Sequence, residues 1–498
     1  MNRVYKNIFA SVLPQFVNII SNFILPGLII LKFGSEVNGL VSATKTVVSY
    51  ISIVGAGIAT AVTQSLYEPV AKRDAEEIKG MLHAANRMFV KFGLLYVAIT
   101  AVTALLYPLC VSSDINGTTI ALLLIVMSLS GASEFFVTGR CRALLYADQK
   151  VYICNIIQAA SLLLSLFAAV LMLKADVGIV WVQLAISLVY VLRAAVLLGY
   201  VNTQYPQLRG FKRVPAIEKA VSKRNDAMIH QLSGLAVTGS QPLILSVLVG
   251  FEAASIYAVY NIVFSGLQSI CANINVALTP YLGRELSLGN EERTKDLYDI
   301  IEFGFSALVT FVFSVAVMMI IPFIRLYTAG ADINYAYKDF ALLFALSSMF
   351  YILKMPGTAA INAAGHFRET RSRALLEAGI CIVLGVMLTA VLGMNGVLLG
   401  ALAALAWRCL DTVVYTNRYI LKTAGKTSLK RVAVCMVTVL VFAAISVHVE
   451  LRAASYMMWV IYACGVSLFA AAVVAVAAVL LEKTTIRKIV LLIRGKLR

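Results

Sequence analysis

The apolar residues of this chain come in blocks of about 20, and this block length restricts the possible folds more than any other feature. A helix rises about 1.5 Å per residue, so a block of ~20 residues spans the ~30 Å hydrocarbon core of a bilayer. Lipid offers the backbone no hydrogen bonds, which makes a helix the expected form of each block. The composition agrees, with 60% apolar and 13% charged residues and a mean hydropathy of +0.87. The sequence therefore predicts an all-α polytopic membrane protein.

Fourteen blocks are long enough to cross the membrane, and the shortest turns between them lie near residues 175 and 395. The predicted spans are 8–31, 38–66, 88–109, 118–139, 151–173, 177–200, 228–250, 253–279, 303–324, 339–363, 374–394, 396–421, 432–449 and 456–481.

The basic residues give this topology a direction. Of the 42 Lys and Arg residues, 33 lie in the N-terminus, in alternate connections and in the tail after residue 481, and the opposite connections hold five. By the positive-inside rule, this bias predicts that both termini are cytoplasmic. It also accounts for the net charge of +17 by contact with anionic lipid, so no nucleic-acid partner is expected. The tail "IRKIVLLIRGKLR" is expected to be either an interfacial helix or a partly ordered segment.

An internal repeat relates the two halves of the chain. A shift of 216 residues aligns "KFGSEVNGLVSATKTVVSYIS" (32–52) with "LVGFEAASIYAVYNIVFSGLQ" (248–268), and Arg193 with Arg408 to within a residue. The matching pairs are Gly34 with Gly250, Glu36 with Glu252, Ser49 with Ser265, and Lys79 with Lys295. Six spans separate the copies, so both have the same orientation, which is typical of transporters whose substrate site lies between two lobes.

The repeat predicts two pseudo-symmetric six-helix lobes plus two extra C-terminal helices. The predicted domains are an N-terminal lobe (1–202), a cytoplasmic linker (203–227), a C-terminal lobe (228–421), two accessory helices (432–481) and a basic cytoplasmic tail (482–498).

Polar residues at helical spacing mark the first two helices of each half. In the second span, Asn38, Ser42, Lys45, Ser49 and Ser52 fall on one face, and the shift of 216 places Lys45 on Asn261. The other stripes contain Gln15, Asn18 and Asn22; Gln231, Thr238 and Gln241; and Asn261, Ser265, Gln268 and Asn275. We expect these stripes to line a hydrated cavity. Two alternatives stay open: such residues often hydrogen-bond neighbouring helices, and Lys45, about 10 Å from the outer end of its helix, can extend toward the surface.

Charged residues inside the predicted spans are further candidates for the cavity. Arg193 and Lys354 are candidates for lining it, and Lys354 precedes Pro356 and Gly357, where a helix can kink and expose carbonyls. Arg408 and Asp411 are three residues apart, which predicts a structural ion pair. Glu377 is expected to reach the surface or to pair with a neighbouring base.

Nothing in the sequence points to a catalytic residue, a cofactor or a metal site. The eight cysteines are scattered, most of them within apolar blocks, and no CxxC or Cys/His spacing occurs, so they are interpreted as small buried hydrophobic residues. No nucleotide-binding loop is present, and no predicted outer connection exceeds about 15 residues. An embedded glycosyltransferase or polymerase would be expected to have a large outer loop or an acidic catalytic cluster, so the sequence disfavours an enzyme.

The run "FGSEVNGLVSATKTVVSYISIVGAGIATAVTQSLYEPVAKRD" resembles bacterial polysaccharide flippases of the Wzx type, within the multidrug/oligosaccharidyl-lipid/polysaccharide exporter superfamily. The Gly-Ser-Glu-x-Asn-Gly turn (34–39) and the Leu-Tyr-x-Pro-x-Ala-Lys-x-Asp loop (66–74) carry the resemblance, and fourteen spans extend it over the chain. It implies transfer of an undecaprenyl-diphosphate-linked oligosaccharide from the inner to the outer leaflet of the bacterial cytoplasmic membrane, by alternating access, for surface polysaccharide biosynthesis. It also implies contact with membrane lipids and with a polysaccharide polymerase and glycosyltransferases as partners.

The residues themselves suit such a substrate. A diphosphate needs cationic partners, for which Lys45, Arg193 and Lys354 are candidates, and amides and hydroxyls suit sugars. The predicted substrate-binding residues are Lys45, Ser49, Asn18, Asn22, Gln241, Asn261, Gln268, Arg193 and Lys354.

Two related transporters remain as alternatives. A drug or organic-cation antiporter would be expected to have buried carboxylates in the N-terminal half, where Glu134 is the main candidate, and twelve spans. A flippase for the peptidoglycan precursor lipid II shares fourteen spans but would be expected to have more arginines near the first helix than Arg3.

Overall fold

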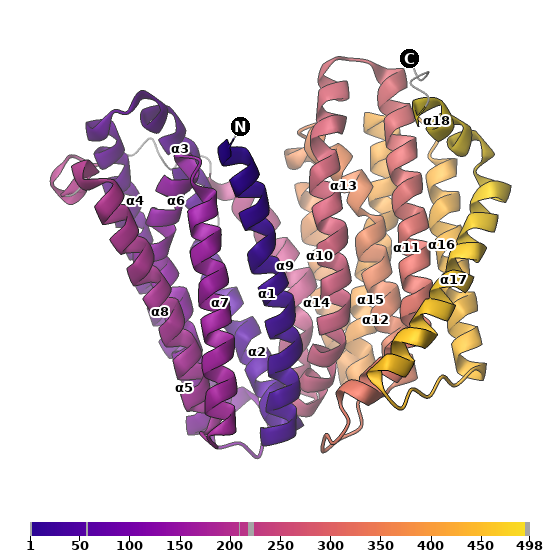
Figure 1. Ribbon diagram of the computed structural model, residues 1–498, viewed down its shortest axis with the longest axis horizontal. Coiled ribbons are helices and arrows are strands. Elements are labelled where there is room, and N and C mark those ends of the chain that lie inside the picture. Colours follow the sequence, from indigo (N-terminus) through magenta and orange to yellow (C-terminus); the bar gives the residue numbers. More distant parts are fainter. Residues whose placement is uncertain (1, 56–57, 209, 218–223, 494–498) are drawn as a thin grey trace. The chain divides into compact units, whose positions relative to one another are not determined.

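The computed structural model describes residues 2–55, 58–208, 210–217 and 224–493. Within these ranges the chain is helical and contains no β-strand (Figure 1). It divides into two compact units, Met1–Ala258 and Val259–Arg498, here called the first and the second unit. The boundary lies inside the helix α10, whereas the lobes expected from the repeat meet at the 203–227 linker. Those lobe limits stay a prediction.

The first unit contains long helices joined by short turns. Its elements are α1 (Asn2–Phe33), α2 (Ser35–Ser52), the 3₁₀ turn η1 (Ile53–Gly55), α3 (Ile58–Lys72), α4 (Ala75–Cys110), α5 (Gly117–Ser133), the π-helix η2 (Glu134–Thr138), α6 (Gly139–Ala147), α7 (Val151–Lys174), α8 (Ile179–Gln204), the 3₁₀ turns η3 (Pro206–Leu208) and η4 (Phe211–Arg213), α9 (Arg224–Leu248) and the start of α10 (Phe251–Ser287). A buried apolar cluster that includes Leu40, Leu66 and Tyr96 holds these helices together.

The second unit begins within α10 and also consists of helices joined by short connections. Its further elements are α11 (Glu291–Tyr327), α12 (Lys338–Leu353), α13 (Met355–Ala363), α14 (Phe367–Leu392), α15 (Met394–Tyr415), the π-helix η6 (Thr416–Ile420), α16 (Lys426–His448), α17 (Tyr456–Leu481) and α18 (Lys483–Ile493). The tail was expected to be either an interfacial helix or partly ordered, and its residues 483–493 form α18.

Twelve helices among the described residues are long and apolar enough to cross a membrane. The second and seventh of the fourteen predicted spans are not among them. The second, 38–66, is interrupted after Ser52 by η1, and the seventh has a shorter apolar helix over Ser233–Leu248. Both regions carry predicted polar stripes, which lower the hydropathy of a helix. The multi-pass membrane character is confirmed, and the count of fourteen stays a prediction.

The helix order of the first repeat recurs 216 residues later. The helix α4 begins at Ala75 and α11 at Glu291, and α7 and α14 begin at residues 151 and 367. The turns recur as well, because Gly34 and Gly250 precede α2 and α10 with φ of 86° and 124°, a conformation that favours glycine. Even the helix caps correspond. Asp74 accepts hydrogen bonds from the first turn of α4, and Asn290 accepts one from the first turn of α11.

The basic connections of each unit lie together at one end, here called the basic end. In the first unit, Arg140 lies over the Phe211 ring at 5.5 Å, and His83 contacts the Val214 carbonyl at 2.6 Å. Figure 1 shows the helix α3 and the start of α1 at this same end of the first unit. In the second unit, Lys422 pairs with Glu291 at 2.5 Å across two basic connections. This arrangement is the one that the alternating charge bias predicts for a polytopic chain.

A small polar group holds the start of the linker at the basic end of the first unit. The Tyr205 hydroxyl donates a hydrogen bond to Asp148 and accepts one of 3.0 Å from Lys150. Burial raises the pKa of Tyr205 to about 12, so the hydroxyl keeps its proton at neutral pH. The linker residues after α8 are therefore tied to the turn between α6 and α7.

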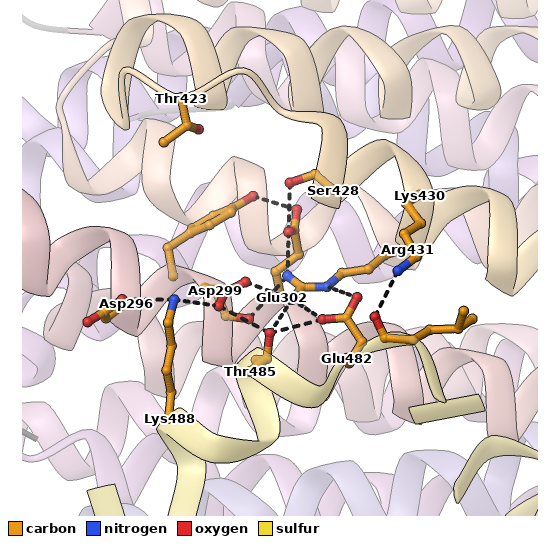
Figure 2. A network of polar contacts seen from close by, with 12 residues as sticks. Asp296, Asp299, Glu302, Thr423, Ser428, Lys430, Arg431, Glu482, Thr485 and Lys488 are labelled. Carbon is orange, nitrogen blue, oxygen red and sulfur yellow. Dashed lines mark hydrogen bonds and ion pairs between the residues drawn. The ribbon is translucent and has the colours of Figure 1, made fainter. Parts of the chain in front are cut away.

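The C-terminal helices are attached to the second unit by a buried network of ion pairs (Figure 2). Arg431 of α16 contacts Asp299 at 2.7 Å and Glu302 at 2.9 Å on α11, and Glu482 after α17 at 2.7 Å. Lys488 of α18 also reaches Asp299, at 2.9 Å. Only 3% of the Arg431 side chain is exposed. A single guanidinium thus joins α11, α16 and the start of α18.

Candidate functional site

Each unit contains a break in a membrane-crossing helix at an equivalent position. In the first unit, the π-helix η2 (Glu134–Thr138) separates α5 from α6, and the shift of 216 residues maps it onto residues 350–354. In the second unit, α12 ends at Leu353 and α13 begins after Lys354, with Pro356 in its first turn. Breaks of this kind interrupt the backbone hydrogen bonds and are frequent at functional sites. Both breaks also carry a charged side chain.

The break in the first unit holds an ion cluster formed by Glu134, Arg142 and Arg193, here called the Glu134 cluster. The carboxylate of Glu134 lies 2.6 Å from the Arg142 guanidinium and 3.4 Å from that of Arg193. Arg193 comes from α8 and lies over the Tyr190 ring at 5.1 Å. The Arg193 and Glu134 side chains are 15% and 29% exposed. The cluster is therefore half-buried within the helices.

A second irregular segment packs directly against this break. Gly55, the last residue of η1, lies so close to Phe135 of the π-helix that a Cβ on Gly55 would stand 2.2 Å from the ring. Phe135 also contacts Tyr96, whose hydroxyl donates to the Ser128 carbonyl at 3.0 Å. The interruption after α2 and the π-helix that carries Glu134 are thus in contact.

The break in the second unit holds a larger cluster, here called the Glu377 cluster. It consists of Lys354, Arg373, Glu377, Arg408 and Asp411. Lys354 pairs with Glu377, whose carboxylate also lies 3.4 Å from Arg408. Arg408 lies 2.7 Å from Asp411, which in turn pairs with Arg373. These side chains come from the α12–α13 break, α14 and α15, and the Glu377 side chain is only 8% exposed.

Both clusters contain one more cation than anion. The Glu134 cluster has two guanidinium groups and one carboxylate, and the Glu377 cluster has three cations and two carboxylates. Removing charge from water costs several kcal/mol per ion, on the order of the whole stability of a domain, and the carboxylates offset this for their partners. The remaining positive charge in each cluster is available to an anion. Such an arrangement suits an anionic ligand better than a cationic one.

Within the stripe on α2, Asn38 is buried, Ser42 and Ser52 are half-buried, and the middle of the stripe faces away from the buried side of the helix. Lys45 and Ser49 are exposed, whereas Ala43 and Val47 on the other face are buried. Among the described residues, no carboxylate pairs with Lys45. Ser49 donates a hydrogen bond of 2.8 Å to the carbonyl of Lys45. The side chain of Lys45 is thus free for a ligand, while its place in a cavity stays a prediction.

The other predicted stripe residues differ in exposure. On α1, Asn18 is exposed and Asn22 is half-buried, and on α10 both Asn261 and Gln268 are half-buried. The side chain of Gln231 lies outside the residues whose burial is described.

Two of the amides make the contacts expected of the alternative interpretation, in which polar residues hydrogen-bond within and between helices. Gln241 is buried and donates to the Val237 carbonyl at 2.7 Å, and Gln268 donates to Ser348 of α12 at 3.1 Å.

In the structure, Arg193 and Lys354 belong to ion clusters. The sequence had marked both as candidates for a cavity lining but did not predict their carboxylate partners. The expected pair of Arg408 with Asp411 is confirmed, and Glu377 pairs with bases as one alternative held. Arg142 and Arg373 lie just outside the predicted spans 118–139 and 374–394, and neither was among the predicted site residues. Their roles depend on which helices pack together, and spacing within one helix gives no signal for that.

Comparisons with known proteins support the fold. No family model matches the chain, and no curated protein matches it in sequence. A solved structure of the lipid II flippase MurJ in an inward closed conformation is 12% identical, with a TM-score of 0.67 over 96% of this chain and 99% of that one. An inward-facing multidrug resistance MATE family transporter of the MOP superfamily is 11% identical, with a TM-score of 0.61 over 82% of this chain and 98% of that one.

A eukaryotic MATE transporter gives a similar result, with 14% identity and a TM-score of 0.58 over 86% of this chain and 99% of that one. At these identities the likeness is one of fold. The chain therefore has the fold of the MOP-superfamily transporters.

Proposed function

We propose that this chain is a flippase that moves an undecaprenyl-diphosphate-linked oligosaccharide from the inner to the outer leaflet of a bacterial cytoplasmic membrane by alternating access. The observation that carries the proposal is the surplus positive charge of the Glu134 and Glu377 clusters, together with the unpaired Lys45. A diphosphate carries about two negative charges near pH 7 and needs cations of this kind. Both termini are proposed to be cytoplasmic, and the product would serve surface polysaccharide biosynthesis.

The roles of the polar residues follow from their chemistry. Arg193 and Lys354 are each held by a carboxylate, which keeps the cation in position when no substrate is bound. Amides and hydroxyls on α1, α2 and α10 offer donors and acceptors to sugar hydroxyls. The candidates are Asn18, Asn22, Ser49, Asn261 and Gln268. Transport of this kind needs no catalytic residue or cofactor.

The charge balance argues against an organic-cation antiporter. A cation site requires a carboxylate that is not already matched by bases, and the acids in both clusters are outnumbered by cations. Two of the MATE neighbours align with 82% and 86% of this chain, a smaller share than the 96% that aligns with the lipid II flippase structure.

A lipid II flippase is the second candidate. The structure of a lipid II flippase aligns with 96% of this chain, which supports a polyprenyl-diphosphate substrate of either kind. The two candidates differ in the sugar and share the diphosphate. They are therefore separated by substrate competition and not by the cation clusters.

The experiment measures flipping of a fluorescent undecaprenyl-diphosphate oligosaccharide in proteoliposomes that contain the purified chain. We expect flipping by the unmodified chain and a loss of at least tenfold in Lys45→Ala/Lys354→Ala, with Lys174→Ala as a control outside both clusters. In cells, the double variant should lose surface polysaccharide at normal protein levels. Full surface display by that variant would refute the proposal, and competition by lipid II but not by other oligosaccharide lipids would favour the second candidate.

A further inference from the structure

A pocket at the end of the second unit opposite its basic end has no role in the function proposed above. It holds about 650 Å³ of space, including its open mouth, between α11, α12 and α16. A second, shallow hollow that is open to solvent shares Pro322 and Arg325 with it. Together they are called the α11–α12 pocket.

The inner walls of the α11–α12 pocket are apolar. Val317 and Ile321 of α11, Leu342 of α12 and Val447 of α16 line it. Val317 lies eight residues before Arg325 on the same helix, which corresponds to a depth of about 12 Å. This is most of the ~15 Å half-thickness of a hydrocarbon core. The walls are therefore suited to hydrocarbon.

The mouth of the pocket is basic. Three basic residues line it: Arg325 near the end of α11, Lys338 at the start of α12 and Arg452 in the connection between α16 and α17. These are three of the five basic residues that the sequence places in the outer connections, where cations are otherwise rare. Their convergence on one pocket is not explained by the distribution of charge along the chain.

One cation at the mouth is left without an acid. Glu450 lies 3.5 Å from Lys338 and 2.9 Å from Arg452, and Asp339 also lines the pocket. Among the described residues, Arg325 has no ion-pair partner. Arginine binds phosphate oxygens through its planar fork of donors, and the second guanidinium at the mouth reinforces this preference.

Aromatic residues place the mouth at the depth of lipid head groups. The indole of Trp459 donates to the Met319 carbonyl at 3.1 Å and lies 5.6 Å from the Phe323 ring. Tryptophan and tyrosine concentrate where a membrane meets water, and Tyr327 ends α11 at the same level. The cations at the mouth thus lie where phosphates of a leaflet lie.

From these observations we infer that the α11–α12 pocket binds an anionic phospholipid of the leaflet opposite the basic end, the outer leaflet in the predicted orientation. The phosphate contacts Arg325 and Arg452, and one acyl chain occupies the apolar walls. A zwitterionic head group brings a cation together with its phosphate and leaves the surplus positive charge unmatched, so binding discriminates by the net charge of the head group. The inference does not depend on the transported substrate.

The test uses the full chain in uncharged detergent, with bound lipids counted by native mass spectrometry. The probes are palmitoyl-oleoyl phosphatidylglycerol and the matching phosphatidylcholine. We expect phosphatidylglycerol to be retained at least fivefold over phosphatidylcholine, and Arg325→Gln/Arg452→Gln to lower its apparent affinity about tenfold. The control Lys174→Gln removes another outer cation and should leave retention unchanged. Equal retention of both lipids, or equal losses in the control, would overturn the inference.

Two further arms identify the source of the phosphate and the role of the walls. Glycerol 3-phosphate carries the phosphate without acyl chains, and millimolar amounts should not displace the lipid; displacement would overturn the lipid assignment in favour of a soluble phosphate. Ala443→Leu narrows the apolar wall and should lower lipid retention while the thermal unfolding midpoint stays within a few degrees. Unchanged retention in a folded Ala443→Leu chain would also contradict the assignment.

Discussion

The side-chain amide of Asn38 donates a buried hydrogen bond of 2.7 Å to the hydroxyl of Ser255. The two residues belong to corresponding turns of the internal repeat, because the shift of 216 residues maps Gly39 onto Ser255. At the same crossing, a Cβ on Gly39 would stand 1.6 Å from the Phe251 carbonyl oxygen. The helices α2 and α10 therefore approach each other backbone to backbone at equivalent positions.

Gly39→Ala should destabilise the protein severely, because the added methyl group meets backbone atoms that cannot rotate away. We expect a loss of about 1–3 kcal/mol or more in unfolding free energy. The measurement is the thermal unfolding midpoint of the purified chain in detergent. Gly199→Ala is the control, since nothing lies within 4 Å of its added Cβ. An unchanged midpoint in Gly39→Ala would show that the two helices do not cross here.

Arg431→Met should loosen the attachment of the C-terminal helices. The variant leaves Asp299, Glu302 and Glu482 without their shared guanidinium, and breaking a buried ion pair costs about 3–5 kcal/mol. Limited proteolysis should then cut α18 much faster than in the unmodified chain. The exposed Lys426 at the start of the same helix provides the control Lys426→Met, which should change the rate little.

Glu377→Gln should separate the structural and the transport roles of its cluster. The variant removes the negative charge that pairs with Lys354 and Arg408. Because these cations are buried, the thermal unfolding midpoint should fall. Adding Lys354→Met removes one of these cations and should restore much of the stability. Transport should stay low in the double variant if Lys354 binds the diphosphate, and flipping at the unmodified rate would exclude that role.

Gly80→Val should release the linker from the first unit. The amide of Ile217 donates to the Gly80 carbonyl at 3.1 Å, and a Cβ on Gly80 would stand 2.7 Å from the Ile217 side chain and 3.1 Å from the Pro215 carbonyl. Trypsin should therefore cut after Arg213 several times faster in the variant. Equal rates in both chains would contradict this packing, and Gly199→Ala again serves as the control.

Membrane potential should influence net flipping. Moving about two negative charges outward across ~100 mV, interior negative, releases roughly 4–5 kcal/mol. If the surplus cations neutralise the loaded carrier, the same energy acts on the return of the empty carrier. Collapsing the potential in proteoliposomes, with ion gradients balanced, should slow transport of the labelled lipid. An unaffected rate would show that the potential does not bias the cycle.

The sequence was informative wherever a property depends on neighbours along the chain. Block length predicts membrane helices, and the spacing of Arg408 and Asp411 predicts their pair, because both are local in one helix. The interruption after Ser52 escaped prediction, since it depends on contact between Gly55 and Phe135. The partners of Arg193, Lys354 and Arg431 likewise depend on how helices rotate against one another, which packing decides and spacing does not.

The buried network around Arg431 has a consequence for synthesis of the protein. Glu482, Thr485 and Lys488 are among its members and are translated after the twelve described membrane-crossing helices. Until these three residues have been translated, Arg431 of α16 can pair only with Asp299 and Glu302 of α11. The ion-pair network of the second unit therefore forms only after α17 has been translated, and a product that stops before residue 482 leaves Arg431 without the carboxylate of Glu482.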